Sequence, residues 1–256
     1  MPAVYAHECF GRTVAAQLDG EVAEVIRKYD APFQIGLQGP DIFFFFGAHT
    51  DNPVVRFGEH LHNVSAAPFF TNALGVIRQK GRMSREYAYL CGFVCHFILD
   101  SECHPYVEEM IRETGVQHLE IEEEFEKLLL KEDGKDPIGF PVATLVPTDL
   151  ATAQAIQPFY PVKPQRFQNG GRREYIPLGI IRQSLFSMKW IKSLLTAPQP
   201  WKQNTINRIM KEQTSFYSHR NASFISFTYA ATYGTQSLPY CPQSFTIAEP
   251  TIAPSD

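Results

Sequence analysis

Apolar residues recur at helical spacing along much of the 256-residue chain. The segment 12–29 is a clear example, because its apolar residues follow one another at steps of four: Val14, Leu18, Val22 and Ile26. Such a stripe is typical of one buried helix face. Basic residues close the segment and suit the negative end of a helix dipole. We therefore predict the first helix over residues 12–29.

The strongest helical pattern is "MSREYAYLCGFVCHFILDSECH", residues 83–104. Ser84 is a candidate N-cap, because its hydroxyl can accept a hydrogen bond from a backbone N–H of the first turn. Pro105 predicts the end of this helix, because proline disfavours helical geometry at the residue before it. His104 is therefore expected at or near the helix end.

Three later segments, 118–134, 178–195 and 203–213, also show helical periodicity. We expect residues 178–195 to pack in the bundle and not to insert into a membrane, because Leu185 and Phe186 interrupt any polar face. Prolines between residues 137 and 164 indicate long, ordered connections. Neither an internal repeat nor a coherent set of alternating strands is evident. The predicted fold class is all-α, a multi-helix bundle.

The end of the sequence differs from the rest. From residue 222 onward the chain is rich in Ser, Thr, Pro and Tyr and lacks a helical period. A segment of this kind is compatible with an extended or a disordered conformation. We expect one helical domain over residues 1–221 and a C-terminal tail over residues 222–256, whose structure we leave unassigned.

Composition excludes few functions. With 44% hydrophobic and 20% charged residues, the chain is typical of a soluble globular protein. A net charge of -4 provides no overall basic field, so we expect no stable nucleic-acid complex. The longest strongly apolar run, "DIFFFFGA", is much shorter than the roughly 20 residues that cross a bilayer. We expect no transmembrane segment, although transient membrane contact remains compatible with the sequence.

The cysteines and the first residues concern the cellular compartment. Five cysteines form an odd set in a chain that is too long to need disulfide bonds for its stability. The first residues lack the basic and apolar regions of a secretory signal. Together these features predict a reducing, cytoplasmic location.

Metal-type ligands are spaced at helical intervals in the middle of the chain. His96, Asp100 and His104 are four residues apart, so neighbouring members of the set share a helix face. His118 and Glu122 repeat the spacing on the next predicted helix. Imidazole and carboxylate are ligands that suit zinc. Two such sets are more specific than one.

A structural interpretation competes with each of these pairs. A single His-x-x-x-Asp pair is more often a surface or core pair than a metal site. Apolar residues surround His96, however, and a charged Asp100 among them needs a partner or a metal to offset its desolvation. For His118 and Glu122 the alternative is stronger, because they lie in an acidic run that is typical of a solvated face.

Further candidate ligands lie upstream. Asp41 follows Gly-Pro and precedes an apolar run, where a simple helix N-cap is the competing interpretation. His60 and His62 share a face on a strand but not on a helix, so spacing alone does not choose between them. His7 has no local signal of its own.

The ordered motifs "YAHECFG", "GLQGPDIFFFF", "GEHLHN", "GFVCHFILDSECHPYV" and "HLEIE" resemble the bacterial zinc-dependent phospholipase C family. That family is related to phosphatidylcholine-cleaving phospholipase C and to the S1/P1 nucleases. The resemblance covers roughly residues 1–125. It implies an all-helical scaffold with up to three zinc ions.

The resemblance also implies a ligand set. One zinc would be held by a group of four residues: Asp41, His62, His96 and Asp100. Asp100 would bridge to a second zinc, which His7 also binds. His104, His118 and Glu122 would hold the third. His62 is preferred to His60 because the family's histidine follows a Gly-x-x-Leu pattern, leaving His49, His60 and His219 without a role.

The implied activity is that of a zinc-dependent phosphodiesterase resembling phospholipase C, which hydrolyses the glycerol–phosphate ester of a phospholipid. Clustered metal ions can bind phosphodiester oxygens and activate a water molecule, so no nucleophilic side chain is needed. Asp41 is the candidate catalytic base that orients or deprotonates this water. The alternatives are a nuclease or nucleotidase with the same zinc cluster, or a noncatalytic zinc-stabilised binding protein. Nearby phenylalanines either pack in the core or receive acyl chains.

Overall fold

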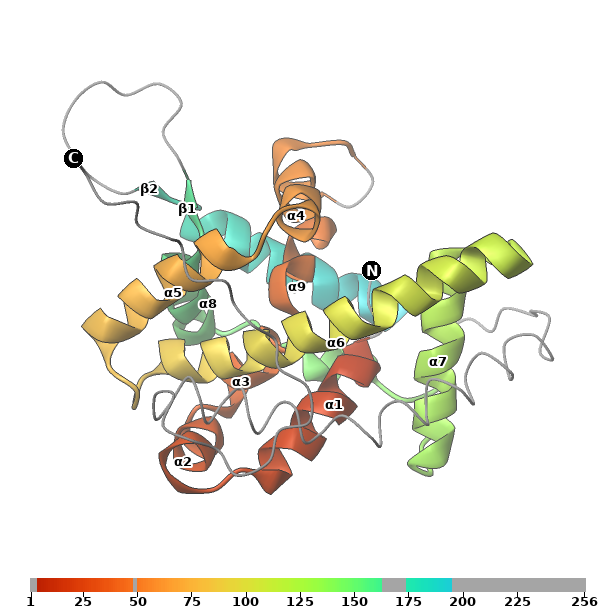
Figure 1. Ribbon diagram of the computed structural model, residues 1–256, viewed down its shortest axis with the longest axis horizontal. Coiled ribbons are helices and arrows are strands. Elements are labelled where there is room, and N and C mark those ends of the chain that lie inside the picture. Colours follow the sequence, from red (N-terminus) through yellow and green to blue (C-terminus); the bar gives the residue numbers. More distant parts are fainter. Residues whose placement is uncertain (1–3, 48–49, 163–173, 195–256) are drawn as a thin grey trace, which may run out of the picture.

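A computed structural model describes residues 4–47, 50–162 and 174–194 (Figure 1). Its α-helices are α1 (Val4–Gln17), α2 (Gly20–Lys28), α3 (Asp30–Gly36), α4 (Pro53–Asn63), α5 (Ala67–Lys80), α6 (Arg85–Thr114), α7 (His118–Glu132), α8 (Leu150–Ile156) and α9 (Leu178–Leu194). Its 3-10 helices are η1 (Gly39–Phe45), η2 (Val142–Leu145) and η3 (Gln157–Phe159). One short antiparallel pair, β1 (Pro161–Val162) with β2 (Glu174–Tyr175), accompanies them. The fold is all-α, as predicted.

Helix α6, with 30 residues, is the longest of the described helices. It crosses α3 at close range, because glycines lie at the contact on both helices. A Cβ atom on Gly36 would lie 2.3 Å from the Tyr89 carbonyl oxygen, and one on Gly92 would lie 2.2 Å from the Phe33 carbonyl oxygen. Neither position tolerates a side chain without separating the helices. This crossing places η1, which follows α3, against the middle of α6.

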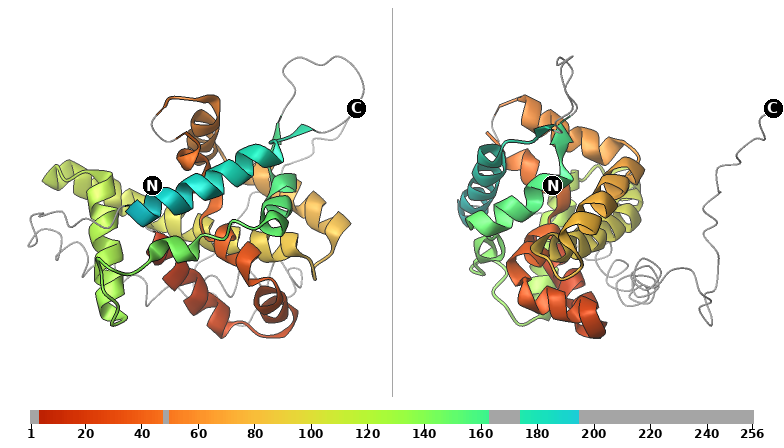
Figure 2. Two further views of the ribbon diagram at one scale, coloured as in Figure 1. Left: turned by 180° about the vertical axis from the view of Figure 1, so that it is seen from behind. Right: turned by 90° about the vertical axis from the view of Figure 1, so that its left-hand side faces the viewer.

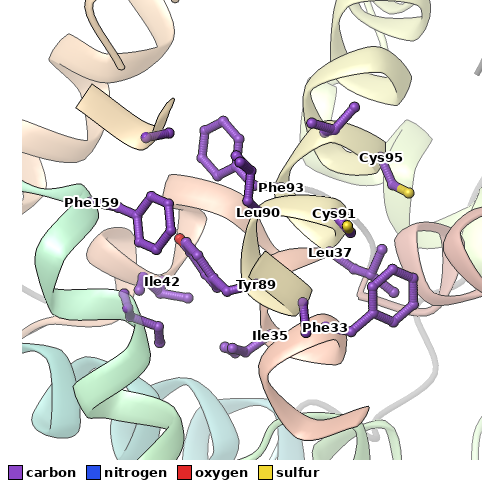
Figure 3. Packing of buried hydrophobic residues seen from close by; sticks show 14 of the residues in the cluster. Phe33, Ile35, Leu37, Ile42, Tyr89, Leu90, Cys91, Phe93, Cys95 and Phe159 are labelled. Carbon is purple, nitrogen blue, oxygen red and sulfur yellow. The ribbon is translucent and has the colours of Figure 1, made fainter. Parts of the chain in front are cut away.

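The main hydrophobic core surrounds that crossing (Figure 3). The apolar run after Asp41 forms η1, and its Ile42, Phe43 and Phe45 are buried. Figure 2 shows α6 and α9 on opposite sides of the bundle, and both contact η1. The segment that carries the candidate ligand Asp41, η1, is therefore held inside the core.

A second apolar cluster joins three helices at the other end of α6, where α7 stands across the end of the bundle (Figure 1). Its buried members come from α1, α6 and α7: Ala6, Val107, Met110, Ile121 and Phe125. This cluster fixes how α7 docks on α6.

The predicted first helix over residues 12–29 is wrong. The chain forms α1 and α2 instead, with a break at Leu18 and Asp19. Asp19 is extended and Gly20 has a φ of 58°, which an Asp-Gly pair adopts at a turn and which the apolar stripe does not reveal. Helix α1 begins at Val4, so that His7 lies on a helix.

The predicted end of α6 at Pro105 is also wrong, whereas the Ser84 N-cap is confirmed. Ser84 Oγ accepts a hydrogen bond of 3.2 Å from the Tyr87 backbone N–H. The helix continues through Pro105 to Thr114 and ends at Gly115, which is left-handed. A proline inside a helix costs roughly 3 kcal/mol. We attribute the continuation to the second apolar cluster, because Val107 and Met110 are buried against α1 and α7.

The remaining helix predictions are mostly confirmed. Residues 118–134 contain α7, and residues 178–195 contain α9. Helix α9 packs in the bundle through buried Ile181, Leu185 and Met188, as predicted. The proline-rich connection contains η2, α8 and η3. Segment 203–213 and the tail 222–256 lie outside the described residues. In the described part of the chain, no helix is long and apolar enough to cross a membrane.

Candidate metal centre

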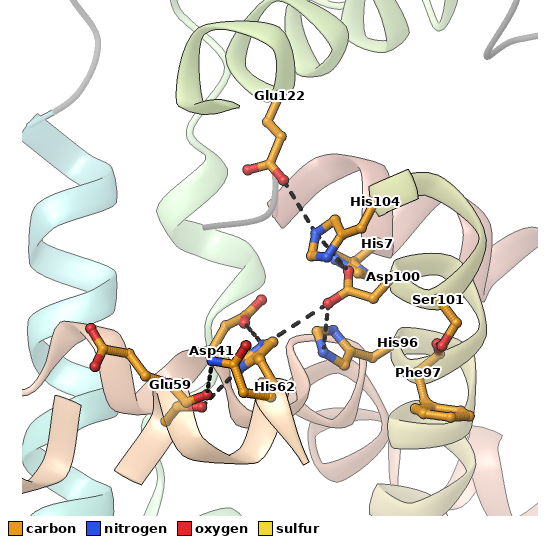
Figure 4. Close-up of polar contacts among 12 residues, drawn as sticks. His7, Asp41, Glu59, His62, His96, Phe97, Asp100, Ser101, His104 and Glu122 are labelled. Carbon is orange, nitrogen blue, oxygen red and sulfur yellow. Dashed lines mark hydrogen bonds and ion pairs between the residues drawn. The ribbon is translucent and has the colours of Figure 1, made fainter. Parts of the chain in front are cut away.

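Asp100 lies at the centre of a ring of imidazoles (Figure 4). Its Oδ2 atom is 3.3 Å from His96 Nε2 and 4.0 Å from His62 Nε2. Its Oδ1 atom is 3.3 Å from His7 Nε2 and 3.9 Å from His104 Nε2. The two carboxylate oxygens therefore face different pairs of histidines, and Asp100 is placed to join two sites.

The first set of candidate ligands, which we call the inner group, comes from three elements: Asp41 from η1, His62 from α4, and His96 and Asp100 from α6. One ligand atom from each of these residues lies within 4.8 Å of the others. Asp41 and His96 are buried, with Asp41 only 1% exposed. The competing interpretation of Asp41 as a helix N-cap is wrong, because Asp41 lies within the 3-10 helix η1, whose N-cap is Gln38.

His62 is oriented by two hydrogen bonds. Its Nδ1 donates to the Gly58 carbonyl oxygen at 2.8 Å, and its Nε2 donates to Asp41 Oδ1 at 2.8 Å. Burial alone would lower the pKa of His62, but the hydrogen bond to Asp41 and the Asp41 charge outweigh it and raise that pKa to about 9. The imidazole thus holds a proton on the nitrogen that would bind a metal.

A glycine that the sequence analysis missed supports His96. Gly39 has a φ of 51°, and a Cβ atom there would lie 2.2 Å from His96 Cδ2. Only glycine combines this left-handed conformation with such a close approach. The motif "GLQGPD" carries the signal, because a glycine directly before Pro40 is typical of a tight turn.

The second set, which we call the outer group, consists of His104 from α6 and His118 and Glu122 from α7. Glu122 Oε1 is 2.7 Å from His118 Nε2 and 3.7 Å from His104 Nε2. The side chains of His104 and His118 are both 34% exposed. His118 and Glu122 therefore do not belong to a purely solvated face, because both residues lie on the side of α7 that faces α6.

His7 joins neither group of three or more ligands in the described part of the chain. It is buried, stacks on His96 with ring centroids 4.7 Å apart, and contacts Asp100 through Nε2. The start of α1 is tied to α7, where the Tyr5 backbone N–H donates to Glu126 Oε1 at 2.7 Å. No pattern in the sequence indicated this long-range contact between Tyr5 and Glu126, which positions the helix that carries His7.

The charges of the centre depend on its histidines. Burial would raise the pKa of Asp100, but nearby histidines, His96 first, hold that pKa well below its usual value. Burial is likewise outweighed at Glu122, where hydrogen bonds from His104 and His118 lower the pKa to about 2. Burial lowers the pKa of His96. At neutral pH both carboxylates are ionised, which is the state that binds a cation.

The residues fit zinc. Asp41 Oδ2 is buried and accepts no hydrogen bond within the described residues, so an inner carboxylate oxygen lacks the partner that its burial requires. Imidazole nitrogens and carboxylate oxygens form the donor set in both groups. A cation between these side chains would replace the protons that the histidines hold and would bring a water molecule to satisfy Asp41 Oδ2.

A comparison with known protein families decides the membership of the chain. The family described as zinc-dependent phospholipase C matches residues 6–163, more than half of the chain. The chain belongs to this zinc-dependent phospholipase C family. At the level of the family, the activity is that of a zinc-dependent hydrolase, and zinc is the metal. Neither a curated protein nor a solved structure matched the chain significantly.

The zinc-dependent phospholipase C match spans all eight candidate ligands, from His7 to Glu122. Of the three histidines left without a role, His60 is exposed on α4 and lines the cleft described next. His49 and His219 lie outside the described residues.

A cleft of about 1720 Å³ opens above the centre. His62, His96, Asp100 and His104 line it, so both groups contribute to its floor. Its walls are largely apolar and come from α4, α5, α6 and η3. This phospholipase C family member therefore places four of its eight candidate ligands on the lining of a space large enough for a substrate.

Proposed function

We propose that the chain is a zinc-dependent phosphodiesterase that hydrolyses the glycerol–phosphate ester of a phospholipid. The observation that carries this proposal is the position of Asp100, which belongs to the inner group, lies 3.9 Å from His104 of the outer group, and lines an apolar-walled cleft. Water adds across the ester, so that the phosphorus–oxygen bond to glycerol breaks and the glycerol oxygen takes a proton. A diacylglycerol and a phosphomonoester result.

We assign the ligands by their contacts. The inner group would hold one zinc, Asp100 and His7 a second, and the outer group a third. Zinc bound there would supply Lewis-acid stabilisation of the phosphoryl charge and a lowered pKa of water. The side chains do the rest: they fix the positions of the ions and keep the centre anionic enough to bind them.

Asp41 is our candidate for the catalytic base. His62 holds its Oδ1 atom, while Oδ2 accepts no hydrogen bond within the described residues and is available to orient water or take its proton. Asp41 also belongs to the inner group, so its two oxygens would serve a ligand role and a base role. Asp41→Asn keeps an oxygen for the metal but loses the basicity.

The first test is metal analysis combined with a substrate panel. The purified protein should contain more than one zinc per chain and should hydrolyse short-chain phospholipids faster than dinucleotides or single-stranded DNA. Faster cleavage of the nucleic-acid substrates would show that the protein is a nuclease and not a phospholipase. Zinc without any phosphodiester hydrolysis would favour a noncatalytic binding protein, and trace zinc only would remove the basis of the proposal.

The second test is Asp41→Asn. We expect turnover on the best substrate of the panel to fall about a hundredfold, the usual scale for losing a general base, with zinc content and melting temperature nearly unchanged. Asp51→Asn is the matched control, because that carboxylate lies at the surface and pairs with Arg56. Near-normal turnover of the Asp41 variant would disprove the base assignment.

A further inference from the structure

Helix α6 presents one continuous stripe to the cleft, and the stripe changes character along its length. Asp100, Ser101 and His104 line one part of it, and Asp100 and His104 are candidate ligands. One turn towards the N-terminus the lining residues are Phe97 and the candidate ligand His96, and a further turn away the lining residue is Phe93. The separation of Asp100 from Phe93 corresponds to about 10 Å of helix. The cleft is therefore elongated, with a metal end and an apolar end.

The apolar end is walled by aromatic rings from three elements. Phe69 of α5 stacks on Phe93 of α6 with centroids 3.9 Å apart, and Phe159 of η3 lies 6.1 Å from Phe69. Phe97 is 37% exposed and forms the rim. We call the space bounded by Phe69, Phe93, Phe97 and Phe159 the aromatic trough.

Polar groups beside the aromatic trough are already engaged with the protein. Asn72 Nδ2 donates to the carbonyl oxygens of Pro158 and Phe159 at 3.0 and 3.1 Å. The Tyr160 hydroxyl is 2.7 Å from that of Tyr89. These groups tie the walls together and are not directed at a ligand.

Two further polar side chains of the cleft are engaged in the same way. Ser101 Oγ donates to the Phe97 carbonyl oxygen at 2.6 Å. Arg56 Nη1 contacts both carboxylate oxygens of Asp51 at 2.7 Å. A nucleobase would need hydrogen-bonding groups beside the rings and a cation for its neighbouring phosphates. A hydrocarbon chain needs neither, and it gains from covering apolar walls.

We propose that the aromatic trough binds one acyl chain of the substrate, with the chain lying along α6 from the metal end towards Phe93. The proposal rests on the proposed function, because the phosphodiester at Asp100 sets where the chain begins. Phe97 is then a specificity-determining residue that selects substrates by their chain. The headgroup lies on the opposite side of the phosphorus, towards Glu108, which lines the other end of the cleft.

The test measures chain binding without hydrolysis. Monoacylglycerols with acetyl, butyryl, hexanoyl and octanoyl chains are titrated into the zinc-loaded protein by calorimetry, below their micelle concentrations. Affinity should rise about tenfold for every two methylenes that enter the trough and should level off once the trough is filled. Because these probes contain no phosphodiester, a failed substrate panel and a failed chain series are distinguishable.

Variants of the rim localise the effect. Phe97→Ala should weaken binding of octanoylglycerol about tenfold and leave acetylglycerol nearly unchanged, and Phe97→Leu should restore most of the loss. Leu74→Ala is the matched control, because Leu74 is 52% exposed on α5 but does not line the cleft. It should bind like the parent.

Three outcomes would overturn the proposal. The first is an affinity that does not depend on chain length. The second is an equal effect of Phe97→Ala and Leu74→Ala. The third is binding of a thymidine dinucleotide that depends on Phe97 while the acylglycerols do not bind, which would assign the rings to base stacking. Melting curves of all variants confirm that each one is folded.

Discussion

The inner and outer groups use the same kinds of ligand in different settings. The inner group brings buried Asp41, and His62 with a side chain that is 21% exposed, from outside α6 to buried His96 on that helix. The outer group lies between two sequence-adjacent helices and is one-third exposed at His104 and His118. A buried site assembled from distant segments depends on the whole fold, whereas a peripheral one depends on one helix pair. Metal affinity should therefore follow burial and connectivity, not ligand type alone.

Asp100→Asn should have the largest effect, because Asp100 contacts histidines of both groups. Loss of its charge should reduce zinc content at both groups, abolish turnover and destabilise the protein by about 3 kcal/mol, the scale for breaking a buried ion pair. Elemental analysis and urea unfolding measure these quantities. Glu109→Gln is the control, because Glu109 is exposed on the same helix and lines neither group nor the cleft. Retention of full zinc by the Asp100 variant would refute its bridging role.

Gly39→Ala should disturb the inner group only. The substitution combines left-handed strain with a Cβ atom 2.2 Å from His96 Cδ2, so we expect a loss of about 2 kcal/mol in unfolding free energy and of inner zinc. Gly20→Ala is a matched control, because Gly20 has a φ of 58° but a Cβ atom there would meet no heavy atom within 4 Å. Gly20→Ala should therefore show only the cost of the left-handed backbone conformation. Equal zinc content in both variants would contradict the idea that Gly39 is needed to position His96.

A chelator should remove zinc from the two groups at different rates. The outer zinc should leave first, because its ligands are more exposed, with a small drop in melting temperature. Removal of the inner zinc should follow and lower the melting temperature by several degrees, since metal bound only to the native state stabilises it by mass action. Stopped-flow chelation with a zinc indicator, alongside calorimetric melting, measures both steps. Release in a single phase would show that the groups are not distinct.

His118→Ala should have the smallest effect. It removes one ligand from the outer group and leaves Asp100 and the inner group intact, so zinc content should fall by about one ion per chain. Stability should change by less than about 1 kcal/mol, because the His118 side chain is only partly buried, with 34% of it exposed. His60→Ala, also an exposed histidine, should retain all zinc. A collapse of total zinc in the His118 variant would mean that the outer group supports the inner one.

Local chemistry explains which parts of this protein were predictable. The i, i+4 pairs of α6 and α7, the Ser84 cap and the helical class follow from short-range spacing. The break before Gly20 and the continuation of α6 through Pro105 were predicted wrongly. In the first case an Asp-Gly turn overrode an apolar stripe. In the second, packing of residues beyond Pro105 outweighed the cost of a proline in the helix.

By itself the sequence determined the types of ligand, their helical spacing and, through its motifs, the family. Tertiary structure alone decided that η1 buries Asp41 beside His62, that His7 stacks on His96, and that α7 closes the outer group against His104. The reason is the range of the forces involved. Helical spacing is set by hydrogen bonds within one turn, whereas these contacts depend on apolar clusters that join helices far apart in the chain.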